Sequence, residues 1–96
     1  MHNTLKEKLE EYKAITGVSF DPSKLPTPQS ISVSQLALVR QIMMLYIGSR
    51  QEDLMLKIQS LPKTGNMPVI QDVKQSMLKE LQHLDDIGYA WESIST

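Results

Sequence analysis

The sequence contains no cysteine, and this absence removes whole classes of site at once. Disulfide bonds and thiolate metal sites both require cysteine, so neither can form. A chain without cysteine suits a reducing compartment. The polar start, residues 1–7, lacks the basic stretch and the apolar run of a signal peptide. We therefore expect the protein to be cytoplasmic.

An excess of charge of one sign is also missing. The 10 Lys and Arg residues nearly balance the 11 Asp and Glu residues, for a net charge of -1. Proteins that bind nucleic acid usually carry a basic face, so this balance argues against nucleic acid as a partner. The longest apolar run, residues 36–47, is interrupted by Arg40 and Gln41. Because a bilayer requires roughly 20 mainly apolar residues, we expect no membrane segment.

Residues that commonly carry catalysis or bind metals are scarce. The only histidines are His2, near the start of the chain, and His83. His83 and Asp86 could share a metal ion, but two ligands seldom hold zinc, so we interpret His83 as a surface residue in a local ion pair. Neighbouring carboxylates such as Asp85 and Asp86 point about 100° apart on a helix and do not converge. The four glycines are isolated and form no phosphate-binding loop, so we predict no catalytic, cofactor or metal site.

What the sequence does contain is helical periodicity. Near its end, apolar residues recur at steps of three and four, interrupted only by Glu80, and this spacing is typical of a helix with one buried face. Capping boxes begin at Thr4, Ser32 and Ser49, while Gly17 and Gly48 are suited to ending helices. The predicted helices span about residues 5–16, 33–47, 50–61 and 68–87 or longer. The apolar stripe of the last helix comprises Ile70, Val73, Met77, Leu84, Ile87, Trp91 and Ile94.

The segment between the first two predicted helices is rich in proline. Pro22, Pro26 and Pro28 prevent a continuous helix, although Asp21-Pro22 could begin a single helical turn. We predict an extended segment, held on the bundle by Phe20, Leu25 and Ile31. The expected fold is therefore all-α: one domain, residues 1–96, forming a small four-helix bundle with this proline-containing extended segment between helices 1 and 2. The second helix, apolar almost all round, should lie in the centre.

Aromatic residues are few, and two of the five lie near the end of the chain. Because chain ends commonly fray, Trp91 needs cover, either from its own bundle or from a partner or second copy. The sequence leaves these two possibilities open. Methionine adapts its shape and recurs on binding surfaces, which adds Met44 and Met55 as candidates. The predicted interface residues are Ile87, Tyr89, Trp91, Ile94, Met44 and Met55.

These patterns favour a small non-enzymatic protein that acts by protein–protein binding. A regulator, chaperone, antitoxin or immunity-type factor would fit, as small bacterial proteins often have this outline, and we expect a homodimer formed through the last helix. The alternative is a DNA-binding transcriptional regulator with a helix-turn-helix around Gly48, in which helix 3, about residues 50–61, reads the DNA, although Glu52 and Asp53 would repel phosphates. An enzyme would need Arg40, Tyr12 or Tyr46, and a carboxylate in one pocket; otherwise Arg40 lies at a solvent-facing edge.

Overall fold

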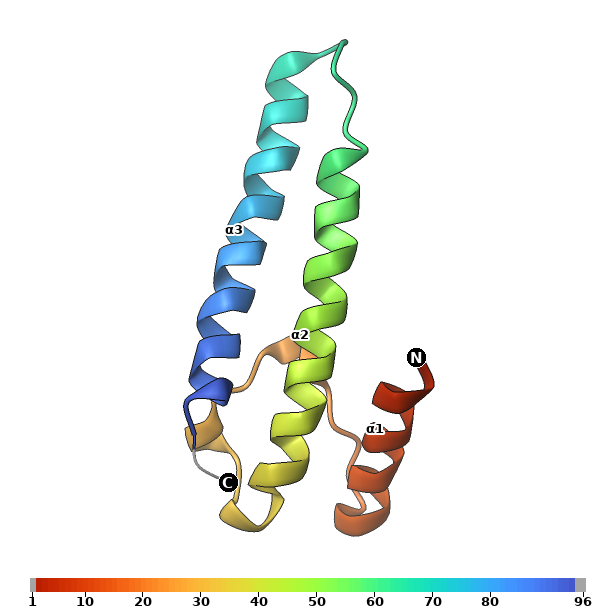
Figure 1. Cartoon of the computed structure of the whole chain (residues 1–96), viewed down its shortest axis with the longest axis vertical. Coiled ribbons are helices and arrows are strands. Elements are labelled where there is room, and N and C mark those ends of the chain that lie inside the picture. Colours follow the sequence, from red (N-terminus) through yellow and green to blue (C-terminus); the bar gives the residue numbers. More distant parts are fainter. Residues whose placement is uncertain (1, 95–96) are drawn as a thin grey trace.

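The computed structural model describes residues 2–94, which form a long antiparallel hairpin of two helices with a shorter helix beside its lower half (Figure 1). The hairpin makes the molecule elongated, with extents of 51 × 25 × 19 Å. The second helix of the chain contacts both of the others, which confirms its central position. The helices are α1 (His2–Thr16), α2 (Leu36–Gln59) and α3 (Met67–Glu92).

The prediction of four helices is wrong, because the two middle ones form the single helix α2, which runs through Gly48. A glycine inside a helix costs only about 1 kcal/mol. Burial of one large apolar side chain contributes about 1.5–3 kcal/mol, and Ile47 and Leu54, on either side of Gly48, are both buried against α3. Ser49 therefore lies inside a helix rather than at its start, and the turn that a helix-turn-helix requires does not exist.

Helix α1 ends where the sequence predicts. Gly17 adopts a left-handed conformation with φ of 76°, and its N–H donates to the carbonyl oxygen of Lys13 at 2.8 Å. Glycine suits this position because it has no Cβ to clash with the backbone. The side of α1 that carries Leu9 and Tyr12 is only half-buried, so α1 covers α2 without being enclosed itself.

The proline segment, residues 17–35, is not simply extended but contains three short 3₁₀ turns, η1 (Pro22–Lys24), η2 (Pro28–Ser30) and η3 (Val33–Gln35). A proline occupies the first turn of η1 and of η2, because its fixed φ suits a helical start and its missing N–H is not needed there. Asp21 caps η1 by accepting the N–H of Ser23 at 3.0 Å. The predicted anchors of this segment pack half-buried against the core, as expected: Phe20, Leu25 and Ile31.

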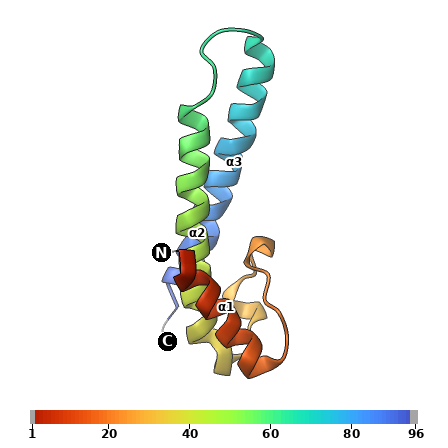
Figure 2. The same ribbon diagram turned by 90° about the vertical axis from the view of Figure 1, so that its right-hand side faces the viewer.

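The core lies in the lower half of the hairpin, where α1 and the proline segment cover it (Figures 1 and 2). Among residues 48–83, all of which the structure describes, Leu54 alone is buried, with 2% of its surface exposed. The upper half of the hairpin therefore consists of two helices without a third layer. The buried core residues are Val39, Ile42, Met43, Ile47, Leu54, Leu84, Ile87 and Trp91.

Candidate functional site

Trp91, the residue whose cover the sequence left open, is buried by its own chain. None of its surface is exposed, and its indole Nε1–H donates to the carbonyl oxygen of Pro26 at 2.8 Å. Of the other two apolar candidates near the C-terminal end, Ile87 is buried and Ile94 is half-buried against the same core. These three residues belong to the fold of the single chain rather than to its free surface.

Arg40 has a different role from those that the sequence suggested. Its Nε donates to the backbone carbonyl oxygen of Trp91 at 3.0 Å. The last carbonyl groups of a helix have no intrahelical partner and carry partial negative charge, so a cation stabilises them. Arg40 therefore caps the C-terminal end of α3.

The remaining three candidates, Met44, Met55 and Tyr89, are exposed. Two polar contacts between α2 and α3 define the two sides of the hairpin. Gln51 donates to Asp85 at 2.7 Å on one side of the seam. Arg50 binds Glu80 on the other side, because neighbouring residues of a helix point about 100° apart.

All three exposed candidates lie on the side of the Gln51–Asp85 contact. Met44 is seven residues before Gln51 and Met55 is four after it, which places both within about 40° of Gln51 around α2. Tyr89 follows Asp85 by four residues on α3, so it lies on the same side. The sequence-based candidates thus divide into a buried set and an exposed set that shares one surface.

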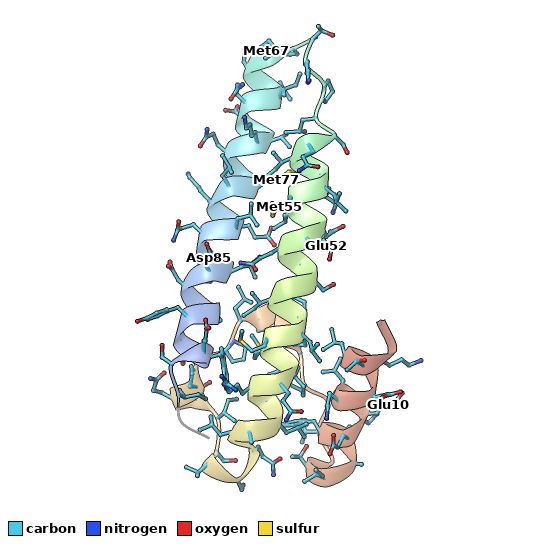
Figure 3. The ribbon with its side chains drawn as sticks, viewed as in Figure 1. Glu10, Glu52, Met55, Met67, Met77 and Asp85 are labelled. Carbon is cyan, nitrogen blue, oxygen red and sulfur yellow. The ribbon has the colours of Figure 1, made fainter. Side chains whose placement is uncertain are left out.

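We call this surface the methionine face. Figure 3 shows Met67, Met55 and Asp85 following one another down the hairpin. By helical spacing from Asp85, Leu78 and the half-buried Leu81 lie on the same side of α3. The exposed apolar residues of the face are Met44, Met55, Met67, Leu78 and Tyr89.

A shallow hollow lies at each end of the methionine face, and the two carry opposite charge. The lower hollow, about 470 Å³, includes Met44 and Tyr89 and is lined by three carboxylates, those of Asp85, Asp86 and Glu92, with no Lys or Arg. The upper hollow, about 480 Å³, includes Met67 and is lined by Lys63 and Lys74, with no Asp or Glu. The face therefore has an acidic end, an apolar middle and a basic end.

The opposite side of the hairpin carries a network of ion pairs. Arg50 donates to both carboxylate oxygens of Glu80, at 2.7 and 3.2 Å, and to Asp53 at 3.1 Å. Lys57 completes the network by binding Asp53 at 3.1 Å. The hydrogen bonds from Arg50 lower the pKa of Glu80 below its usual value, so Glu80 stays ionised at neutral pH.

This charged side contains a further hollow of about 320 Å³, lined by Tyr46, Arg50, Asp53 and Leu56 among others. It does not unite the residues that an enzyme was expected to use. Arg40 is bound to the carbonyl of Trp91, and the ring of Tyr12 packs 5.2 Å from that of Phe20. In this hollow Arg50 is bound to Asp53, and Glu52 also lines it.

The part of the chain that the structure describes offers neither a cluster of metal ligands nor a helix that could cross a membrane. Among residues 4–94, whose side chains the structure describes, no group of three or more His, Asp or Glu side chains could hold a metal ion. His83 is exposed, and Asp86 accepts a hydrogen bond from Gln82 at 3.1 Å. Within the same residues, no helix combines the length and the apolar character needed to cross a bilayer.

Sequence reasoning missed the Arg50–Glu80 pair and the charged ends of the methionine face. Glu80 is the only polar interruption of the C-terminal stripe, and such an interruption at a seam position indicates a partner across the seam. The opposite charges of Lys74 and Asp85 also had a signal in the sequence, because the spacing of eleven residues between them places both on one side of the predicted helix.

Comparison of the chain with protein-family models, with curated proteins and with solved structures gives no match.

Proposed function

We propose that this chain is a non-enzymatic protein that binds another protein chain through the methionine face. The observation that carries the proposal is a row of exposed apolar side chains on one side of the α2–α3 hairpin. Soluble monomers rarely expose long contiguous apolar surfaces, and such surfaces commonly mark interaction sites. Methionine, with three rotatable bonds and a polarizable sulfur, packs against partners of varied shape.

The shape of the face favours a helical partner. Two antiparallel helices present a groove along their seam, and side chains of an opposing helix can pack into it. The 24 residues of α2 make the face about 36 Å long, and two adjacent helices make it about 20 Å wide. A surface of this size accommodates a helix of several turns or a second hairpin.

The contrast between the two sides of the hairpin supports this choice of surface. The side of Arg50 and Glu80 carries hydrated ion pairs that would lose water on binding. The middle of the methionine face carries apolar side chains, whose burial is favourable. A partner therefore gains more by covering the methionine face than by covering the ion-pair network.

Other expectations from the sequence stay predictions. The roles of regulator, chaperone, antitoxin or immunity-type factor all use protein binding, and the geometry of the hairpin does not favour one among them. A cytoplasmic location also stays a prediction. The helix-turn-helix that suggested DNA binding does not form around Gly48, because α2 is continuous through this residue.

The test compares two neighbouring residues of α2. Met55 and Leu56 are almost equally exposed, at 53% and 56%, but Leu56 lines the hollow on the other side of the hairpin. We expect Met55→Glu to abolish retention of protein partners by the tagged chain in an extract of its native host, and Leu56→Glu to preserve it. Circular dichroism of both variants monitors folding. Identical sets of retained proteins for the wild type and both variants would contradict the proposal.

A further inference from the structure

We propose that the partner of the methionine face is a second copy of this chain, packed antiparallel about a two-fold axis. The inference rests on the proposed function, because it uses the same face. In a two-fold dimer the same surface of both copies meets, so the face must be complementary to itself. The charges of the two ends and the spacing of residues along α3 both meet this condition.

The charges at the two ends of the methionine face favour an antiparallel pair. An antiparallel pair places the hollow of Asp85 and Glu92 against the partner's hollow of Lys63 and Lys74. A parallel pair would place acid against acid and base against base. Because like charges that face each other across an interface oppose association, the charges select the antiparallel arrangement.

The spacing of residues along α3 also fits an antiparallel pair. With Tyr89 left aside, six residues of α3 that point to the methionine face are separated by steps of seven, four, three, four and seven, a series that reads the same in both directions. Its centre lies between residues 79 and 80. The members of this series are Met67, Lys74, Leu78, Leu81, Asp85 and Glu92.

Rotation by 180° about an axis through this centre pairs residues of suitable chemistry. Lys74 comes opposite Asp85 of the second copy, and Leu78 comes opposite Leu81 of the second copy. The contacts between the helices place Met55 near the level of residues 78–81, so each Met55 lies close to its own equivalent at the axis. An ion pair at each end and apolar contacts in the middle are typical of a specific interface.

The area of the methionine face is close to that of a dimer interface. A face about 36 Å long and about 20 Å wide covers about 700 Å² of projected surface. Specific interfaces bury roughly 800 Å² on each partner, so one face is close to sufficient for a stable dimer. The two hairpins would pack face to face as a four-helix bundle. Each would cover the upper half of the other hairpin, which no third helix of the same chain covers.

The first experiment measures the mass of the full chain by size exclusion with light scattering and by sedimentation equilibrium. We expect about twice the 10.9 kDa of one chain at micromolar concentration. Met55→Glu places two carboxylates together at the axis and should weaken association about a hundredfold. Leu56→Glu, the matched control, should change the dissociation constant by less than about threefold.

The second experiment tests the antiparallel pairing with charge reversals. Lys74→Glu and Asp85→Lys each place like charges together and should weaken self-association about tenfold. When the two variants are mixed, each reversed residue meets a residue of opposite charge, so a heterodimer should form with wild-type affinity. The double variant should also recover wild-type affinity. Circular dichroism confirms that every variant retains its helix content.

Three results would overturn this inference, and each bears differently on the proposed function. A wild type that is monomeric at 100 μM rejects the second copy as the partner, while the extract experiment still decides whether the face binds another protein. A dimer unaffected by Met55→Glu uses a different surface, which rejects this inference, and the extract experiment again decides whether the methionine face binds another protein. If Met55→Glu abolishes the dimer but mixing the charge variants does not restore it, the methionine face is still the interface and the antiparallel arrangement is rejected.

Discussion

Replacement of Trp91 tests whether the end of α3 is held by the proline segment. The side chain is completely buried, and its indole N–H is bonded to the carbonyl oxygen of Pro26, 65 residues away. Trp91→Ala removes the apolar contacts and the hydrogen bond together. Trp91→Phe keeps a large apolar ring but leaves the carbonyl of Pro26 without its donor. Together the two variants separate packing from hydrogen bonding.

The expected magnitudes follow from these contacts. Truncation of a fully buried tryptophan to alanine typically lowers the free energy of unfolding by about 3–5 kcal/mol. Loss of the N–H donor in Trp91→Phe should cost about 1–3 kcal/mol, because a buried acceptor is left unpaired. Since small domains are stable by only about 5–15 kcal/mol, Trp91→Ala should lose a large part of the total.

Urea denaturation followed by circular dichroism at 222 nm measures these changes, because Trp91 is the only tryptophan and its fluorescence is lost on substitution. Protein concentration is held constant, since self-association would add to the apparent stability. Val33→Ala serves as the control, because Val33 is 87% exposed and its truncation should cost less than about 0.5 kcal/mol. A loss below about 1 kcal/mol for Trp91→Ala would refute the buried position of Trp91.

Three further predictions concern a single ion pair and two glycines. The hydrogen bonds from Arg50 lower the pKa of Glu80 in the folded chain, so the unfolded chain takes up the proton first as pH falls. The ion pair, which is partly exposed, should contribute about 0.5–1 kcal/mol to the free energy of unfolding. This contribution should be complete above about pH 4.3, the usual pKa of an unfolded glutamate, and should be lost as the pH falls through the lower pKa of Glu80 in the folded chain. Urea denaturation from pH 7 to pH 3 should show this loss in the wild type and a smaller one in Glu80→Gln; equal losses would contradict it. Gly48→Ala should raise the free energy of unfolding by about 0.5–1 kcal/mol, because Gly48 lies inside α2 and an added Cβ would meet no neighbouring atom within 4 Å. A lower free energy of unfolding would instead indicate a break in the helix. Gly17→Ala should lower it by about 1 kcal/mol, because its φ of 76° strains any side chain, and an unchanged midpoint would contradict this.

The sequence predicts helix positions well where a strong local signal acts alone. Gly17 and the prolines after it end α1 within a residue of the prediction. Gly48 shows why the same reasoning fails elsewhere, because a glycine that can end a helix does so only when tertiary packing does not oppose it. The seam residues Ile47, Leu54 and Ile58 continue at steps of seven and four across Gly48, and this continuity was the signal for one long helix.

The candidate site was predictable only in part. Met44, Met55 and Tyr89 could be proposed from residue type, because methionine and tyrosine are common at interfaces, and all three are exposed. The cover of Trp91 could not be decided from the sequence, since its partner Pro26 is distant in the chain and accepts through a backbone atom. Residue type carries no information about which backbone carbonyl a side chain will reach.

The bond between Trp91 and Pro26 has a consequence for the order in which this chain folds. The α2–α3 hairpin closes a short loop, residues 60–66, and such local contacts form quickly. The bond from Trp91 to Pro26 instead spans 65 residues, so its closure costs more entropy. Helix α1 and the turns η1 and η3 contact α2, which is nearer in the sequence. We therefore expect the bond between Trp91 and Pro26 to form after these contacts, as a late step in the burial of the core.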